Sequence, residues 1–255
     1  MATVEYWDIE VTRQLVDAMF GINQSMKARE SMISCQERLT FADIHLTHAT
    51  SGWAAHLHSL QSLESQHKPG ANAEMDKSLN RNLLDIGANI HGCVQSLHAL
   101  RDILAHAIYY SLGINHTDPP KSERDVTARH VLKSLRADAS LVKLADPFED
   151  VCQGGDFLYL DALNNHGKHR SLVPVRALTR LGSSRDDTFS LELLEFDYGE
   201  KKYDKRPAIP FLRREYLRMF KALMKCGTTM DGILRVKTGR HSPVMIRTVI
   251  DIDDE

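Results

Sequence analysis

Residues 75–112, MDKSLNRNLLDIGANIHGCVQSLHALRDILAHAIYYSL, decide the fold. The segment is long enough for about ten helical turns, and Gly113 follows it as a residue that commonly ends helices. A long helix is stable in a protein when tertiary packing covers its apolar face. The segment therefore predicts a protein organised around one long helix, and the neighbouring sequence decides which elements cover it.

Amphipathic segments precede this helix. Apolar residues recur at three- and four-residue steps between residues 9 and 26, and again between residues 36 and 66, which is the helical spacing. The residues that carry the two patterns are Leu15, Val16, Met19, Phe20 and Met26, then Leu39, Trp53, Leu57, Leu60 and Leu63. A break at residues 67–72, HKPGAN, separates the second segment from the long helix.

Shorter elements follow the long helix. Ser122 is a candidate N-cap for a helix to about residue 144, and Asp146-Pro147 separates this helix from a final one over residues 157–169. Short loops between amphipathic helices of these lengths predict an antiparallel bundle.

The character of the sequence changes after Arg170. Two strands are expected within residues 171–180 and 188–196, followed by a helix that begins near Pro210 and stops before Gly227. A last strand, VMIRTVI at 244–250, precedes an acidic tail. We therefore expect a mainly α protein. Residues 1–170 form an antiparallel helical bundle domain, and residues 171–255 form a small C-terminal α+β extension with a basic helix and the acidic tail.

Composition excludes several classes of protein. The 255 residues are 26% charged and 42% hydrophobic with a formal net charge of −2, the profile of a globular domain and not of a whole-surface nucleic-acid binder. No stretch approaches the roughly 20 apolar residues of a membrane span, and the N-terminus lacks the apolar core of a signal peptide. The four scattered cysteines indicate reduced thiols, so we expect a cytoplasmic protein with no membrane partner.

The long helix carries a line of polar residues. His91, Gln95, His98 and Asp102 follow one another at four-, three- and four-residue steps, and His106 extends the line by four more residues. Polar groups on an apolar helix are costly to bury unless they are paired. An aspartate beside a histidine can prepare the imidazole for general acid–base catalysis. The alternative is a structural hydrogen-bond network that fixes the register of the helix.

In the same segment, Arg101, Asp102 and His106 form an Arg-x4-His pattern with a polar residue directly after the arginine. The pattern resembles the motif of the HEPN superfamily, helical-bundle proteins of prokaryotic toxin–antitoxin and antiviral defence systems. The resemblance implies a metal-independent endoribonuclease that needs no cofactor and acts on RNA between two protomers of a homodimer. His106 would be the general acid or base, and Arg101 would bind the scissile phosphate. An antitoxin or another regulatory protein would be a further partner.

A second segment, residues 157–170, contains Asn164 followed by Lys168, His169 and Arg170. It resembles uncharacterised bacterial HEPN-like proteins in which an Asn precedes a Lys-His-Arg triplet and the long helix carries His-x3-Asp, here His98 and Asp102. This resemblance implies a polar cleft of His98 and Asp102 with Lys168 and His169, in which Asn164 and Arg170 contact nucleic acid. A structural C-terminal cap is the alternative, because the helix dipole favours cations there.

The C-terminal third is basic. Residues 201–247 contain 13 Lys or Arg and three acids. Arg214, Arg218, Lys221 and Lys225 follow at four-, three- and four-residue steps, which predicts a stripe on one helix face. Such a stripe is the footprint expected for a phosphate backbone, and the alternative is a solvated face that pairs with the acidic tail.

Histidine is abundant, with 13 residues, of which ten lie between His45 and His130. His45, His48, His56 and His58 are either metal ligands or solvent-exposed side chains. The sequence has no HExxH motif and no carboxylate cluster beside them, which favours exposure, so no metal site is expected. The rival to an RNA-directed function is a non-catalytic helical interaction protein whose His, Asp and Lys side chains form a structural polar network.

Overall fold

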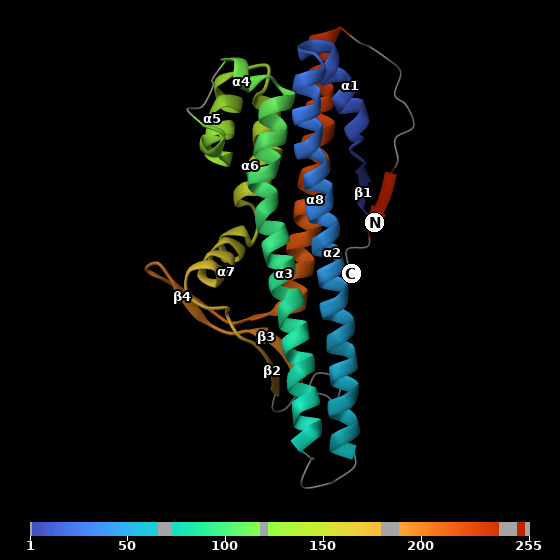
Figure 1. Cartoon of the computed structure of the whole chain (residues 1–255), viewed down its shortest axis with the longest axis vertical. Helices are drawn as coiled ribbons and strands as arrows, with labels where there is room; N and C mark the ends of the chain where they lie inside the picture. The colour runs from blue at the N-terminus through green and yellow to red at the C-terminus, as the bar shows by residue number, and fades with distance from the viewer. Residues whose placement is uncertain (1, 66–72, 118–121, 180–188, 240–248, 253–255) are drawn as a thin grey trace. The chain divides into compact units, whose positions relative to one another are not determined.

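The computed structural model describes residues 2–65, 73–117, 122–179, 189–239 and 249–252 (Figure 1). Its helices are α1 Ile9–Phe20, α2 Ile22–Ser65, α3 Ala73–Ser111, α4 Ile114–Thr117, α5 Ala128–Ala137, α6 Ala145–Gln153, α7 Phe157–His169 and α8 Ala208–Thr238, with short 3-10 helices η1 Glu123–Asp125 and η2 Val142–Leu144. Its strands are β1 Ala2–Glu5, β2 Val175–Thr179, β3 Phe189–Leu193, β4 Phe196–Tyr198, β5 Lys201–Tyr203, β6 Arg206–Pro207 and β7 Val249–Ile252. The expectation of a mainly α protein with a small β component is confirmed.

The chain divides into two compact units. The first unit comprises residues 1–39, 99–157 and 217–255, and the second comprises residues 40–98 and 158–216. Helices α2, α3 and α8 each contribute residues to both units, whereas the sequence-based division was a single point after residue 170.

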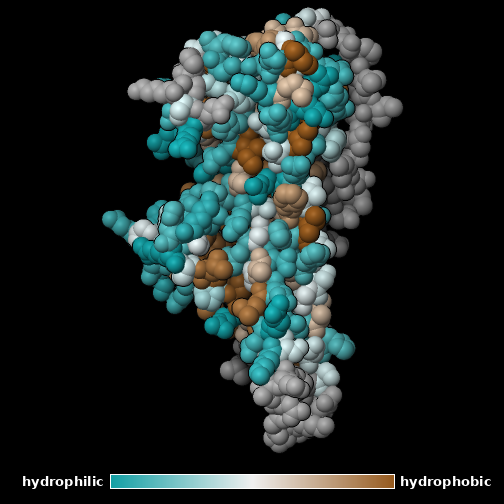
Figure 2. All heavy atoms as spheres, viewed as in Figure 1, coloured by the Kyte–Doolittle hydropathy of each residue, from teal (hydrophilic) through white to brown (hydrophobic). Residues whose placement is uncertain are grey.

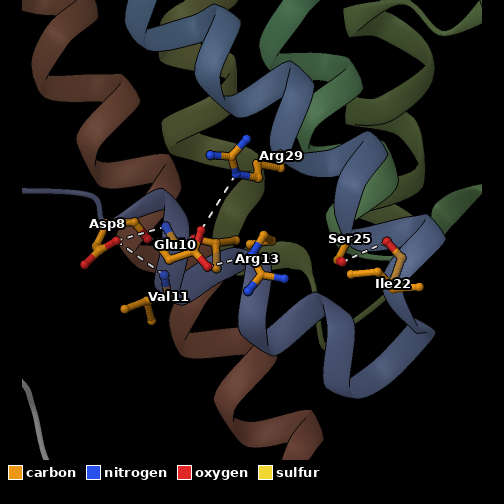
Figure 3. A network of polar contacts seen from close by, with 8 residues as sticks. Asp8, Glu10, Val11, Arg13, Ile22, Ser25 and Arg29 are labelled. Atoms are coloured by element: carbon orange, nitrogen blue, oxygen red, sulfur yellow. Dashed lines mark hydrogen bonds and ion pairs between the residues drawn. The ribbon is translucent and has the colours of Figure 1, made fainter.

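A capped helix opens the first unit (Figure 3). The Asp8 carboxylate accepts hydrogen bonds from the backbone N–H groups of Glu10 and Val11, which would otherwise lack partners at the start of α1. The Glu10 carboxylate contacts Arg13 at 2.6 Å and Arg29 of α2 at 3.7 Å. The helix expected over residues 9–26 is in fact divided, because Gly21 adopts φ 82° and ends α1.

Two corrections concern the middle of the chain. Ser122 does not cap a helix that runs to residue 144: it bonds to the Asp125 carboxylate, and the cap belongs to Thr127, whose side chain accepts the His130 N–H at the start of α5. Pro147 does not separate two helices, because it lies in the first turn of α6, where a missing N–H costs no helical hydrogen bond.

The strands form three small antiparallel sheets. In the second unit, β2, β3 and β6 form one sheet in that order, and β4 pairs with β5. In the first unit, β1 pairs with β7 from the other end of the chain (Figure 1), and β1 was not expected from the sequence. Residues 244–248 of the expected last strand lie outside the described residues. Among the described residues, no helix has both the length and the apolar character to cross a membrane.

Trp7 anchors the core of the first unit. Its side chain is fully buried, its backbone N–H lies 3.5 Å from the Met224 sulfur, and its indole N–H donates to the Thr12 hydroxyl at 2.7 Å. Helix α8 does not stop before Gly227, as the sequence suggested, but continues to Thr238. Gly227 is retained inside the helix because a Cβ there would overlap the Trp7 ring.

Replacing Gly227 with alanine is expected to destabilise the protein by about 1–3 kcal/mol, because the added methyl group overpacks the Trp7 site. Urea or thermal unfolding followed by circular dichroism measures this change. Gly232→Ala in the same helix is the matched control, since a Cβ at Gly232 meets nothing within 4 Å. That control should be neutral or stabilising by up to about 1 kcal/mol. Equal effects of the two substitutions would contradict the packing argument.

Asp231 makes the stability of the first unit depend on pH. The Thr12 hydroxyl accepts from Trp7 and donates to the Asp231 carboxyl at 2.5 Å. Burial raises the pKa of Asp231 to about 7, against an ordinary value of 3.8. The folded protein therefore keeps this proton while the unfolded chain loses it, and the free energy of unfolding falls as pH rises from about 4 to about 7.

Asp231→Asn keeps an acceptor for Thr12 without the charge. At pH 8 it should raise the melting temperature, by about 2–4 °C for each kcal/mol recovered. Near pH 3, below the ordinary value of 3.8, the advantage should vanish, because the carboxyl group is then largely protonated in both states. A difference between variant and parent that is the same at both pH values would show that the charge of Asp231 is not the cause.

Candidate functional site

A pocket of about 680 Å³ in the first unit brings the Arg-x4-His residues together. Arg101 and Asp102 line it from α3, and His106 lies one turn further along the same helix. In a straight helix, residues five apart point about 140° away from each other. The Arg101 and His106 side chains nevertheless line the same pocket, and residues of η1 and of the start of α5 line it as well.

Contacts with Asp102 and Phe157 help to orient the Arg101 guanidinium. Its Nε donates to the Asp102 carboxylate at 3.2 Å, and its plane lies over the Phe157 ring with the central carbon 5.3 Å from the ring centroid. About a quarter of the Arg101 side chain, 26%, is exposed. A partly exposed guanidinium held in this way can bind a phosphate through two parallel hydrogen bonds.

His106 lies between two openings. Besides the larger pocket, it lines a smaller one of about 250 Å³ with Glu30, Ser31 and Ser34 of α2. Its ring centroid lies 6.2 Å from that of Tyr110. The imidazole is half-buried, so it can meet a ligand from either opening.

The larger pocket is electropositive. Arg124 and Arg129 line it together with Arg101, and Asp102 is the one acid among the described residues that line it. Cys152 also lines the wall, where burial raises the pKa of its thiol to about 12. The thiol is therefore neutral near pH 7 and is not a nucleophile there. Arg124 and Arg129 belong to no motif that the sequence revealed.

The structure pairs His98 with a residue that the sequence analysis missed. Its Nε2 lies 2.9 Å from the carboxylate of Asp161 on α7, and its side chain is 8% exposed. Both residues lie in the second unit, whereas Asp102 lies in the first and contacts Arg101. Asp161 is the one acid in residues 157–169, so it could have been considered as a partner for a buried histidine.

The polar line on α3 is not uniform. His91 and His98 are buried, whereas Gln95 is exposed. The His91 ring bonds to the backbone carbonyl of Val173 at 3.0 Å, and desolvation lowers its pKa. His91 is therefore a neutral structural residue near pH 7.

The polar side chains of residues 164–170 do not come together in one site among the described residues. Lys168 and His169 are exposed at the end of α7, and Arg170 donates to the backbone carbonyl of Asp197 at 3.4 Å. Asn164 is 4% exposed, and neither atom of its amide group has a hydrogen-bond partner among the described residues. The exposed cations at this helix terminus fit the capping alternative.

The basic residues of α8 do not form a free stripe. The Arg218 guanidinium donates to the backbone carbonyl of Asp150 and lies 3.4 Å from its carboxylate. Arg214 and Lys221 also have interaction partners, and Lys225 is exposed. Residues 240–247 of the basic region lie outside the described residues.

The N-terminal histidines are dispersed. His45 bonds to Asn89 at 3.1 Å, His56 stacks on Trp53 with its pKa lowered by burial, and His48 and His58 are exposed. Within the described residues, no group of three or more His, Cys, Asp or Glu side chains is placed to hold a metal ion.

No protein-family model, no curated protein and no solved structure matches this chain.

The His98–Asp161 pair predicts strong coupling. A double-mutant cycle of His98→Ala and Asp161→Ala should give a coupling free energy of about 1–3 kcal/mol, because the imidazole is buried against the carboxylate. The Arg136–Glu149 pair is the control, with side chains 52% and 34% exposed. Its coupling should be about 0.2–1 kcal/mol. Urea unfolding of the parent and the six variants measures both. A His98–Asp161 coupling no larger than that of the control would overturn the assignment.

Proposed function

We propose that the chain is a HEPN-like RNA-binding protein that cleaves RNA in the Arg101–His106 pocket without a metal ion. The observation that carries the proposal is the presence of both motif residues in one pocket with two further arginines. RNA is a polyanion, and guanidinium groups bind its phosphates with matched geometry. A histidine supplies proton transfer near neutral pH.

The chemistry follows from the nucleophile that RNA itself carries. His106 takes the proton of a ribose 2′-OH, and the 2′-oxygen then forms a bond to the adjacent phosphorus. The bond from phosphorus to the 5′-oxygen breaks, and that oxygen leaves with a proton taken from water. The products are a 2′,3′-cyclic phosphate and a free 5′-OH. Arg101 stabilises the negative charge on the non-bridging oxygens during the transfer.

The setting of this activity follows from the same resemblance. We propose that two copies of the chain form a homodimer and that an antitoxin or another regulatory protein restrains the activity. The process would be prokaryotic antiviral defence or a related toxin–antitoxin response in the cytoplasm. The second opening at His106, between α2 and α3 residues, gives a partner copy access to this side chain.

A non-catalytic interaction protein is the second candidate function. It is favoured because polar residues that the sequence offered as site candidates pair within the protein: His98 with Asp161, and Arg218 with Asp150. Exposed apolar residues of α2, Phe41 at 46% and Ile44 at 43%, are available to a partner. Figure 2 shows such apolar areas among hydrophilic ones on the described surface.

Cleavage of RNA in excess EDTA distinguishes the two candidates. The parent protein should produce 2′,3′-cyclic phosphate ends, and His106→Ala and Arg101→Ala should each lower the rate by about 10²–10⁴-fold. His48→Ala, an exposed histidine on α2, is the matched control and should leave the rate unchanged. Circular dichroism checks that each variant is folded.

Two other outcomes reject the assignment. Cleavage that is insensitive to Arg101 and His106 but lost in His169→Ala would move the site to the end of α7. If the folded parent protein cuts no RNA, the result favours the second candidate function, a non-catalytic interaction protein.

A further inference from the structure

The pocket that Arg101 and His106 line contains two further cations that the proposed cleavage chemistry does not use. Arg124 comes from η1 and Arg129 from the first turn of α5, and both line the pocket. Both side chains are exposed, and neither has an ion-pair or hydrogen-bond partner among the described residues. They are therefore available to a ligand, in contrast to Arg218 of the basic helix, which contacts Asp150.

The position of Arg129 is unfavourable in the empty protein. The start of a helix carries a partial positive charge, so a cation in the first turn is disfavoured and an anion is favoured. Helix α5 has no acidic residue in its first turn, and Arg129 stands where an acid would be stabilising. The acid next to Arg124, Asp125, bonds to the backbone and hydroxyl of Ser122. A bound anion would relieve this concentration of positive charge.

The size and chemistry of the pocket argue for more than one phosphate. Its volume of about 680 Å³ is that of a pocket for a drug-sized ligand and far exceeds the space that a single phosphate needs. The arginines that line it come from three elements: Arg101 from α3, Arg124 from η1 and Arg129 from α5. Val126, Ala128 and Leu132 give the wall an apolar part against which a ribose or base can pack. An acidic peptide would not need such an apolar wall between its charges.

We propose that Arg124 and Arg129 hold a second phosphate, next to the one at Arg101, so that the ligand of the pocket is a single-stranded oligonucleotide with at least two consecutive phosphates. The inference rests on the proposed function for the identity of the ligand as RNA. It assigns Arg124 and Arg129 to binding and not to proton transfer.

Binding of an oligonucleotide that cannot be cleaved tests this inference separately from catalysis. The probe is a fluorescent 2′-O-methyl pentanucleotide, which lacks the 2′-OH nucleophile, and affinity is measured by anisotropy over a range of salt concentrations. Arg124→Ala/Arg129→Ala should weaken binding at least tenfold. Its plot of log affinity against log salt should be shallower by about 0.7, the loss of one phosphate contact on a single strand.

Lys133→Ala/Arg136→Ala is the matched control. It removes the same charge from the same helix, but neither residue lines the pocket. Its affinity should stay within about twofold of the parent, because exposed charges farther away are screened. Circular dichroism verifies folding of both double variants.

Each possible result either supports or overturns the second phosphate position. Loss of affinity in the Arg124/Arg129 variant alone supports the second phosphate position, even if the parent cuts no RNA and the proposed ribonuclease fails. Equal losses in both double variants, no loss in either, or no binding by the parent would overturn it. So would equally tight, arginine-dependent binding of a polyglutamate peptide, which would assign the pocket to an acidic protein partner. If RNA is cut, the Arg124/Arg129 variant should show a raised KM with kcat unchanged.

Discussion

The burial of one face of α3 is the constraint on which the candidate site depends. Leu100, Leu104 and Ile108 follow at four-residue steps and are no more than 1% exposed. Full burial of each such side chain contributes about 1.5–3 kcal/mol, more than most hydrogen bonds contribute in net terms. The rotation of the helix is therefore set by these residues. Arg101 and His106 remain only partly buried in this stretch of the helix, and both side chains line the pocket.

The sequence predicts whatever depends on local spacing. The long helix ends at Ser111, close to the expected residue 112, and the Arg-x4-His pattern on it does line a pocket. The sequence pattern did not predict contacts between segments that are distant along the chain. Asp161 meets His98 only because α7 packs near α3, and β1 pairs with β7 from the opposite end of the chain. A glycine in a helical pattern suggests the end of a helix. At position 227 the glycine instead leaves room for the Trp7 ring, which is far away in the sequence.

Local environment also decides what each histidine can do. Burial lowers the pKa of His56 and His91, so near neutral pH they act as polar packing groups. The His98 ring is hydrogen-bonded to the Asp161 carboxylate. His106 differs because it is half-buried at a pocket that holds arginines. The large number of histidines thus has no single cause, and composition alone could not separate a candidate for catalysis such as His106 from the structural ones.

The same distinction applies to positive charge. The stripe on α8 had the clearer sequence pattern, yet Arg218 is neutralised by Asp150, and Arg214 and Lys221 also have partners. Arg124 and Arg129 had no pattern, because a 3-10 turn and a helix start have no long periodicity. Their charges remain available in a pocket with a single acid among its described lining residues. Affinity for a polyanion depends on cations that the fold leaves unpaired, so the pocket is better suited than the stripe to bind an anionic ligand.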